Sequence, residues 1–429
     1  MQSPVFRLSL SSTDFSVIHM HRPSIWLMIV IFLACMFFLR EPRLQRFDQT
    51  FLHWLLKNAP PSGTSVPLTI VDIGGDSILP KSRPAETKQD AGSAISPVEY
   101  ALFLQAVLEF NPTVVGFEQV LQWDSRQRDQ EQIFLDQAMR VPKLLTAAEL
   151  AVITDPDAPV TEVPAFTQVT GKRGGLVEFS GIAREPNEDL RIISSLGFVN
   201  LPREVSDEVH VPLLFQYRGE VIPSFALEAL LLWMRVTPAE VKVDIGSYIY
   251  LPHGKKIPIG SDGALLVNPS TLKGARSLKL NELLLAAQQH ENKAPGSNPL
   301  EDVRDHIVLA RASGSRGYPQ AYAAAIATVQ ANAFIHRIHW GFDIVFVIVL
   351  AAVSGIARRF SRIDLVLAAI AVTAAYCMVA IVLVARTSVF LPGVLPLGGI
   401  WLLALLCLFA PRAKEDPDLP PIAPPPPSP

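Results

Sequence analysis

The chain has little cysteine, little charge and no excess of basic residues. Its three cysteines, Cys35, Cys377 and Cys407, all lie in apolar runs. The polar part of the chain therefore has neither a disulfide framework nor a thiolate metal site. Charged residues make up only 18% of the sequence, which suits a membrane protein with a large polar part. The formal net charge of -3 argues against nucleic acid as a partner, because phosphate binding requires a clear basic excess.

The sequence also lacks several motifs of catalysis and cofactor binding. It contains no Gly-x-Ser-x-Gly motif and no phosphate-binding loop with its lysine. Ile73-Gly74-Gly75 is not a dinucleotide fingerprint, which needs three spaced glycines followed at once by a helix. The sequence therefore does not favour a serine hydrolase or a nucleotidase, and no cofactor is expected.

Four apolar runs predict membrane spans. Residues 24–39 are followed by charges instead of a small-x-small cleavage site, which favours an uncleaved anchor over a signal peptide. Residues 365–385 and 389–410 contain no charged residue. A helix needs about 20 predominantly apolar residues to cross a bilayer, and both runs have this length. Residues 340–357 form the weakest span, because Asp343 lies inside it, and whether this run is fully inserted stays open.

The charges that flank these runs predict the orientation. Three arginines crowd the short loop 358–364, whereas the opposite turn has only Arg386. By the positive-inside rule, the loop 358–364 is expected in the cytoplasm, and with it both termini. Three arginines after the first span argue for the opposite orientation, but long domains cross the membrane with little regard to charge, so the short loops decide. The predicted parts are a cytoplasmic arm (1–23), an anchor (24–39), an extracytoplasmic domain (40–339), three spans (340–357, 365–385 and 389–410) and a disordered Pro-rich cytoplasmic tail (411–429).

The start of the polar block alternates between two hydrophobic periods. Residues 68–73, 113–117 and 143–147 are short, continuous apolar or β-branched runs, and residues 98–110 and 131–140 space their apolar side chains as helices do. Strands that are apolar throughout are covered on both faces. The pattern predicts an α/β fold, with a mixed, largely parallel sheet flanked by helices in one large domain.

The rest of the block predicts further strands and two long helices. Strands are expected at residues 197–201, 209–217, 247–251, 264–268 and 307–310, and a buried helix at 223–235. Residues 320–338 are expected to form one helix that continues into the span at 340–357.

Three carboxylates follow the first two predicted strands. Asp72 and Asp76 come at the end of the first, and Glu118 ends the second. The carboxyl ends of parallel strands meet at one edge of a sheet, where α/β proteins place their ligands. Such a cluster could hold Mg²⁺ or Ca²⁺ through oxygen ligands, or its members could cap helices and turns, and the sequence leaves both open.

A series of motifs occurs in a fixed order between about Phe47 and His339. In chain order they read LTIVDIGGDSI, VVGFEQVL, GFVNLPREVSDEVHVPLLFQYRGEVIPSFALEALL, SDGALLVNP, DHIVLARAS and VQANAFI. Their order resembles that of the second type of CHASE domain, the cyclase and histidine kinase-associated sensory extracellular domain. The sequence departs from the family pattern at Glu118, where Asp is usual, at His210, where Arg is usual, and at Gln330, where His is usual.

The resemblance implies a sensor of bacterial signal transduction, not an enzyme. It implies a multi-pass protein of the bacterial inner membrane with its large loop in the periplasm. The candidate ligand-binding residues, from the sheet edge and the family motifs together, are Asp72, Asp76, Glu118, Asn200 and His210. The family's cytoplasmic output domain has no counterpart after residue 410, so the signal is expected to pass to a separate cytoplasmic protein.

The expected partners are an unknown small-molecule or peptide ligand outside the cytoplasm, membrane lipid and a cytoplasmic kinase or cyclase. A homodimer is left open. Two other functions remain as alternatives. One is an extracytoplasmic metal-dependent hydrolase that uses Asp72, Asp76 and Glu118, and the other is a membrane scaffold that recruits partners through the Pro-rich segment 416–429.

Overall fold

The computed structural model describes nine stretches of the chain, which fall into two compact units. The described stretches are residues 42–58, 65–74, 95–153, 161–201, 210–292, 301–312, 320–338, 341–357 and 361–409. The helical unit comprises Met1–Phe51, Ile338–Met378 and Leu391–Pro429, and the sheet unit comprises Leu52–Arg337 and Val379–Phe390. Each unit is described by itself.

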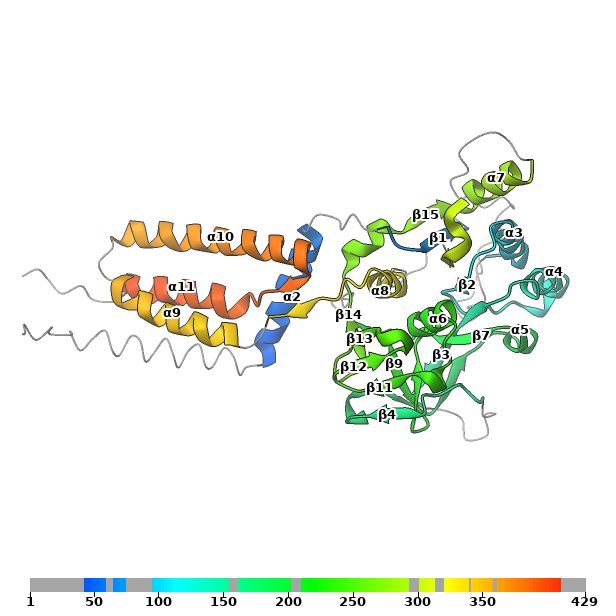
Figure 1. The fold of residues 1–429 in the computed structure, drawn as a ribbon, viewed down its shortest axis with the longest axis horizontal. Helices are drawn as coiled ribbons and strands as arrows, with labels where there is room; N and C mark the ends of the chain where they lie inside the picture. The colour runs from blue at the N-terminus through cyan, green and yellow to red at the C-terminus, as the bar shows by residue number, and fades with distance from the viewer. Residues whose placement is uncertain are drawn as a thin grey trace, which may run out of the picture. The chain divides into compact units, whose positions relative to one another are not determined.

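A seven-stranded sheet forms the centre of the sheet unit (Figure 1). Its strands lie in the order β15-β1-β16-β2-β3-β6, and β7 also pairs with β3. Only the pair of β3 and β6 is antiparallel. This arrangement confirms the predicted mixed, largely parallel sheet. The bounds are β1 (Leu68–Ile73), β2 (Val114–Phe117), β3 (Leu144–Ala151), β6 (Gly181–Arg184), β7 (Ser195–Phe198), β15 (Arg276–Lys279) and β16 (Ile307–Ala312).

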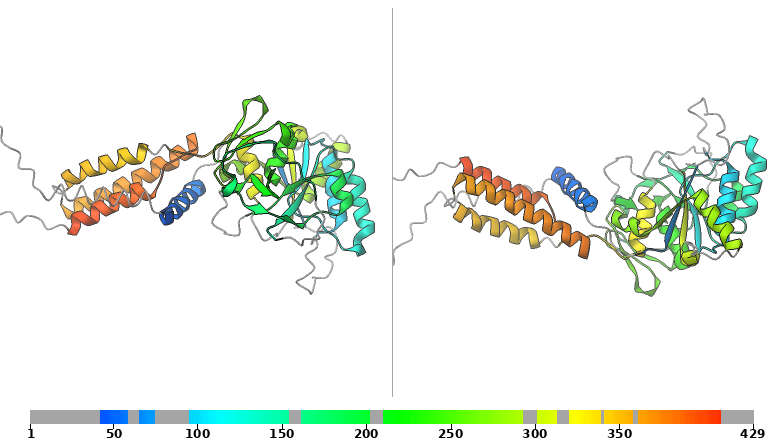
Figure 2. Two further views of the ribbon diagram at one scale, coloured as in Figure 1. Left: turned by 90° about the horizontal axis from the view of Figure 1, so that it is seen from below. Right: turned by 90° about the horizontal axis from the view of Figure 1, so that it is seen from above.

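Helices cover both faces of this sheet, which is why its central strands are apolar throughout. Val71 and Phe117 belong to the core beneath α3, α4 and α7, whereas their neighbours Ile70 and Gly116 point to the opposite face, beneath α6 and α8 (Figures 1 and 2). Adjacent strand residues thus alternate between two cores. The helices are α3 (Pro97–Leu108), α4 (Arg128–Ala138), α5 (Glu188–Ile193), α6 (Phe225–Met234), α7 (Leu280–Glu291) and α8 (Ala321–Gln330).

Serine side chains cap the starts of α3 and α6, two helices with many buried residues. Ser96 Oγ accepts a hydrogen bond from the Val98 amide at the start of α3, and Pro97 occupies the first helical position. Ser224 Oγ accepts from the Leu227 amide at the start of α6. The α6 helix ends where Arg235 adopts a left-handed conformation with φ of 58°.

Smaller sheets complete the described part of the sheet unit. They have the strand orders β10-β9-β5, β13-β12-β11-β4 and β14-β8. The predicted strands of this region overlap β8, β9, β12 and β14, but β4, β11 and β13 were not predicted. The bounds are β4 (Gln168–Thr170), β5 (Glu178–Phe179), β8 (His210–Pro212), β9 (Leu214–Tyr217), β10 (Glu220–Pro223), β11 (Lys242–Asp244), β12 (Tyr248–Tyr250), β13 (Lys256–Pro258) and β14 (Ala264–Leu266).

The prediction of one helix over residues 320–338 is wrong in its second half. The α8 helix ends at Gln330, and Asn332 then takes a left-handed conformation with φ of 52°, which asparagine tolerates better than most residues. The chain continues as β17 (His336–Arg337), which pairs in parallel with β18 (Val389–Phe390). The His336 amide donates to the Ser388 carbonyl at 2.9 Å. A short ladder therefore replaces the expected continuous helix.

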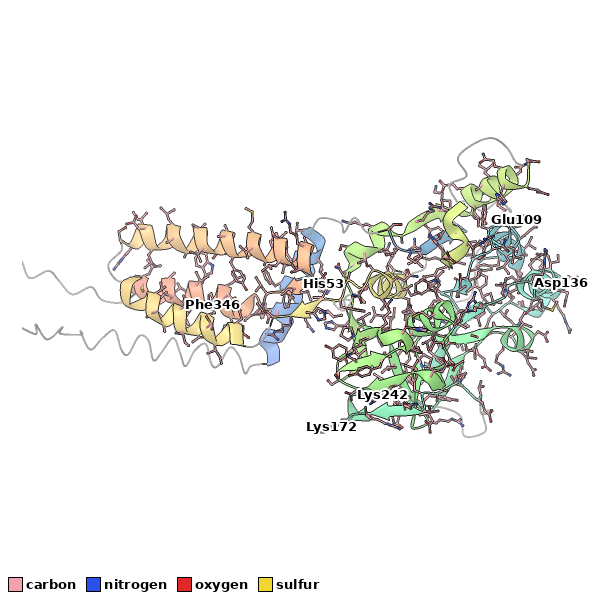
Figure 3. All side chains as sticks on the ribbon, viewed as in Figure 1. His53, Glu109, Asp136, Lys172, Lys242 and Phe346 are labelled. Carbon is pink, nitrogen blue, oxygen red and sulfur yellow. The ribbon has the colours of Figure 1, made fainter. Side chains whose placement is uncertain are left out.

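The described part of the helical unit contains the apolar helices α9 (Gly341–Ala357) and α11 (Val394–Phe409) and the part of α10 (Arg362–Thr387) up to Met378. They share a core, and Phe346, labelled in Figure 3, packs against it. Of the described helices, only α10 is long and apolar enough by itself to cross a bilayer. The α9 and α11 helices have 17 and 16 residues, which is short of the about 20 that a span needs. Four spans are therefore not established, and the predicted anchor at 24–39 and tail at 411–429 lie outside the described residues.

An amphipathic helix that was not predicted, α2 (Pro42–Asn58), precedes β1. Asp48 of α2 accepts hydrogen bonds on Oδ1 from the amides of Gly393, at 2.9 Å, and Val394, at 2.8 Å. A carboxylate in this position satisfies amides at the start of α11 and interacts favourably with the helix dipole.

One glycine of β7 is required by the close approach of α6. A β-carbon at Gly197 would lie 2.8 Å from the Cα atom of Phe225, which is backbone and cannot move aside locally. We expect Gly197→Ala to lower the free energy of unfolding by about 1–3 kcal/mol in urea titrations. Gly174→Ala is the matched control, since no described atom lies within 4 Å of its added carbon. Equal losses in the two variants would contradict this role of Gly197.

Candidate functional site

Three charged side chains form a row across the carboxyl edge of the central strands. Asp72 of β1 is paired in register with Arg311 of β16. Ala310 is paired with Phe117, so the next residues along, Arg311 and Glu118, stand side by side. Strand alternation points all three toward the face covered by α6 and α8. The charged row, Asp72–Arg311–Glu118, thus brings together residues that are far apart in the sequence.

The first two members of the charged row form an ion pair. Arg311 Nε donates to Asp72 Oδ1 at 2.7 Å, and the side chains are only 13% and 29% exposed. A charge-assisted hydrogen bond at such a partly buried place is stronger than one on the open surface. Asp72 is therefore neutralised by an arginine that the sequence reasoning did not include in the site.

Glu118, the third member, has a buried oxygen without a partner. Its Oε1 accepts no hydrogen bond from any described residue. Burial raises the pKa of the Glu118 carboxyl to about 8, and Asp72 adds to this effect while Arg311 opposes it. The carboxyl is therefore mostly protonated at neutral pH, which makes it a hydrogen-bond donor as well as an acceptor.

Tyr322, in the first turn of α8, is a second buried polar group of this region. Its hydroxyl has no hydrogen-bond partner among the residues that the structure places. Burial raises its pKa well above the ordinary value, and the negative charges of Glu118 and Glu149 act in the same direction. Buried polar groups are usually paired, so Glu118 and Tyr322 mark the edge of the sheet as a place with unused hydrogen-bonding capacity.

A second ion pair continues the line of charges on the edge strands. Arg184 of β6 donates from Nε to Glu149 Oε2 at 2.9 Å, and its Nη2 donates to Glu149 Oε1. The fork of the guanidinium thus holds both carboxylate oxygens, which fixes the orientation of the two side chains. This pair joins β3 to its antiparallel neighbour.

The other predicted site residues do not join the charged row. Asn200 binds the backbone of Leu150 twice: its Oδ1 accepts from the amide at 2.8 Å, and its Nδ2 donates to the carbonyl at 2.9 Å. This side chain extends the pairing of β7 with β3. His210 starts β8 and stands opposite Leu266 in a separate two-stranded sheet. Asp76 lies outside the described residues.

No group of three His, Cys, Asp or Glu side chains in the described stretches is arranged to hold a metal ion. Arg311 separates Asp72 from Glu118 in the charged row, and a cation at this place would disfavour a bound metal. Metal ligation that includes Asp76, and with it the hydrolase alternative, stays a prediction.

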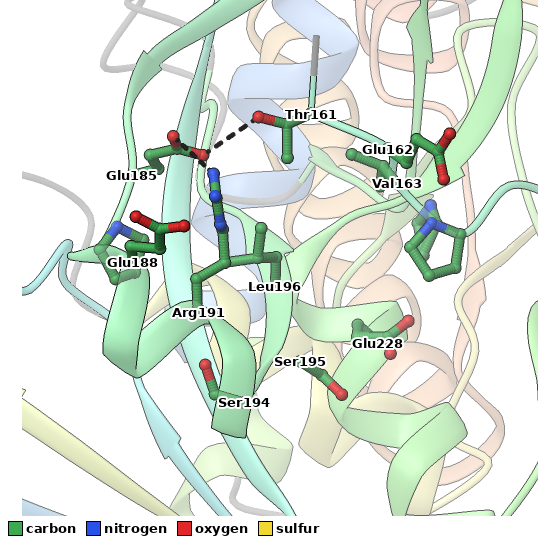
Figure 4. A pocket seen from close by; sticks show the side chains of 13 residues that line it. Thr161, Glu162, Val163, Glu185, Glu188, Arg191, Ser194, Ser195, Leu196 and Glu228 are labelled. Carbon is green, nitrogen blue, oxygen red and sulfur yellow. Dashed lines mark hydrogen bonds and ion pairs between the residues drawn. The ribbon is translucent and has the colours of Figure 1, made fainter. Parts of the chain in front are cut away.

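A cavity of about 610 Å³ lies within the sheet unit and was not foreseen from the sequence (Figure 4). On one side Arg191 Nη1 of α5 donates to Glu185 Oε1 at 2.9 Å, and Thr161 Oγ1 donates to Glu185 Oε2 at 3.5 Å. On the other side lies Glu228, from the first turn of α6. The lining residues are Thr161, Glu162, Val163, Pro164, Glu185, Pro186, Glu188, Arg191, Ser194, Ser195, Leu196, Pro223 and Glu228.

The sheet unit thus combines an α/β architecture with a charged sheet edge and a polar cavity. A family model described as the CHASE2 domain matches residues 27–338, which is more than half of the chain. The protein belongs to the CHASE2 family, whose domains are extracellular, sensory and not catalytic. This confirms the resemblance seen in the sequence motifs. Comparisons with curated proteins and with solved structures found no match.

Proposed function

We propose that the protein is a membrane-anchored extracytoplasmic sensor that passes its signal to a separate cytoplasmic kinase or cyclase. The CHASE2 family supports the sensory role. The apolar helices that follow the domain in the chain support the anchoring, and of the described helices α10 alone has the length and composition of a span. The observation that carries the proposal is the ladder between β17 and β18, because it links the end of the sensory domain to the connections between these helices.

The ladder supports a particular topology for the helices. In the chain, β17 precedes α9, and β18 follows α10. Because β17 and β18 are hydrogen-bonded, the ladder supports an arrangement in which α9 and α10 together leave and return to the same side of a membrane. If α10 crosses, α9 crosses too, although it is short. This supports the arrangement in which β17, β18 and the sensory domain lie outside the cytoplasm and the connection at 358–361 lies inside.

The ladder also offers a physical route for the signal. A ligand that binds two arrangements of the sensory domain with different affinity shifts the equilibrium between them, and a ligand with equal affinity shifts nothing. A movement of β17 would be passed directly to α9 along the chain and to α10 and α11 through β18. The signal would thus reach three helices at once, instead of travelling along one continuous helix.

The topology can be tested with periplasmic and cytoplasmic reporters fused to the full chain after Ser180, after Ser361 and after Pro411. We expect the first fusion to report the extracytoplasmic side and the other two to report the cytoplasm. A cytoplasmic result at Ser180, or an extracytoplasmic result at Ser361, would refute the proposed arrangement.

The ladder itself can be tested with His336→Pro. Proline lacks the amide that donates to the Ser388 carbonyl, so one of the few hydrogen bonds that hold β18 is lost. We expect hydrogen exchange in the peptide around Val389 and Phe390 to become about tenfold faster, as measured by mass spectrometry of the full chain in detergent. His336→Ala keeps the amide and is expected to exchange as the wild type does. The same acceleration in both variants would show that the imidazole, not the ladder, holds this segment.

A further inference from the structure

Glu228 is a buried glutamate that lines the cavity, and one of its carboxyl oxygens has no hydrogen-bond partner among the described residues. The residue is only 8% exposed, and its Oε2 finds no hydrogen-bond partner in the described part of the chain. Figure 4 shows its carboxyl among the lining side chains, across the cavity from the Glu185–Arg191 pair. Buried polar groups are usually hydrogen-bonded, so an unpaired carboxyl oxygen beside a cavity points to a partner that the described residues do not supply.

The charged side chains around the cavity indicate whether a bound partner would carry positive or negative charge. Among the described residues, four glutamates and one arginine line the cavity, and the arginine is already bound to Glu185. Glu162 and Glu188 stand exposed, and Glu228 lies deeper. The potential in the cavity is therefore negative, which attracts a cation and repels carboxylates and phosphates.

The remaining lining distinguishes an organic cation from a metal ion. Divalent ions need several oxygen ligands around one point, and no such group occurs in the described stretches. Between the acids lie Val163, Pro164, Leu196 and Pro223, whose apolar surfaces suit methylene groups. A cavity of about 610 Å³ exceeds the needs of a bare ion and falls in the range of small-molecule sites.

We propose that this cavity is a binding site for an aliphatic amine, whose ammonium group is held by the Glu228 carboxylate and whose carbon chain packs on the apolar lining. An ammonium group donates three hydrogen bonds and accepts none, which complements a carboxylate oxygen that no described donor reaches. The inference names a ligand class for the proposed sensor and to that extent rests on the proposed function. The binding site itself does not depend on the topology of the helices.

The test is isothermal titration of the full chain in detergent with 1,4-diaminobutane at neutral pH. We expect saturable binding of the diamine and none of 1,4-butanediol, its uncharged analogue. Glu228→Gln, which keeps the shape of the side chain, should weaken the binding at least about tenfold, whereas Glu178→Gln, at an exposed position of β5 that does not line the cavity, should leave it unchanged.

A second measurement on the wild-type protein does not depend on how well the variant folds. Burial raises the pKa of Glu228 to about 7, so the carboxyl must lose a proton in part of the molecules when an ammonium group binds at neutral pH. Titrations in buffers of different ionisation enthalpy should therefore reveal proton release. Equal binding of the diol, wild-type affinity in Glu228→Gln, absence of proton release or absence of diamine binding would each overturn the inference, and none of these results would change the outcome of the reporter fusions.

Discussion

Replacing Glu118 by glutamine is expected to remove a large part of the loss of stability that the protein suffers as the pH rises from about 5 to 9. An unfolded glutamate has the ordinary pKa of 4.5, whereas burial raises that of Glu118 to about 8. The folded protein thus binds this proton more tightly than the unfolded chain does. The stabilising contribution is complete below about pH 4.5 and is lost as the pH rises through about 8. A difference of this size corresponds to roughly 5 kcal/mol, of which roughly 4 kcal/mol is lost between about pH 5 and pH 9.

The prediction can be checked by urea unfolding at about pH 5, 7 and 9. The wild-type protein should lose stability over this range, and Glu118→Gln should lose roughly 4 kcal/mol less, since glutamine carries no proton to release. Glu109→Gln is the control, because this exposed glutamate at the end of α3, labelled in Figure 3, should leave the pH profile unchanged. Parallel profiles for the wild type and Glu118→Gln would show that the carboxyl does not keep its proton in the fold. Glu228 contributes a smaller loss of the same sign, which runs from about pH 4.5 to about pH 7 and which both variants retain.

Much of the central sheet could be predicted because the information is local. The continuous apolar runs that became β1, β2, β3 and β16 report burial on two faces, and this property needs no knowledge of the partner strands. The short strands β4, β11 and β13 are different. Each has three residues and is defined by pairing with a strand elsewhere, so its own sequence carries little signal.

The candidate site could be predicted only in part for the same reason. Asp72 and Glu118 end parallel strands, so a common sheet edge was the natural expectation. Arg311 was overlooked because it comes 239 residues after Asp72 in the chain. Only the fold shows that its strand, β16, lies between β1 and β2. The burial of Glu228 depends on the packing of α6, and a glutamate in a helix pattern does not reveal it. The β17–β18 ladder needed the position of residues 389–390, which lie beyond two apolar helices.

Loss of the Arg311 guanidinium is expected to destabilise the charged row at neutral pH. Arg311→Met leaves Asp72 partly buried without its ion-pair partner, and it places two carboxyl groups at the sheet edge without the cation between them. It also removes the positive charge that lowers the pKa of Glu118. Breaking a buried pair costs about 3–5 kcal/mol, and the 29% exposure of Asp72 reduces this to roughly 2–3 kcal/mol.

A double-mutant cycle separates the ion pair from the packing of the arginine stem. If the loss arises from the unpaired charge, Asp72→Asn combined with Arg311→Met should recover more than half of it in urea titrations at neutral pH, because no carboxylate is then left without its cation. Arg126→Met serves as the control, since Arg126 and Asp124 are 3.7 Å apart with 91% and 64% of their side chains exposed, and such a pair should contribute nothing measurable. A double variant as unstable as Arg311→Met alone would show that Arg311 acts through its packing. Recovery would establish that the positive charge of Arg311 stabilises the charged row by pairing with Asp72. A ligand that bound at this edge and competed for the Arg311 guanidinium would then change the stability of the sheet edge.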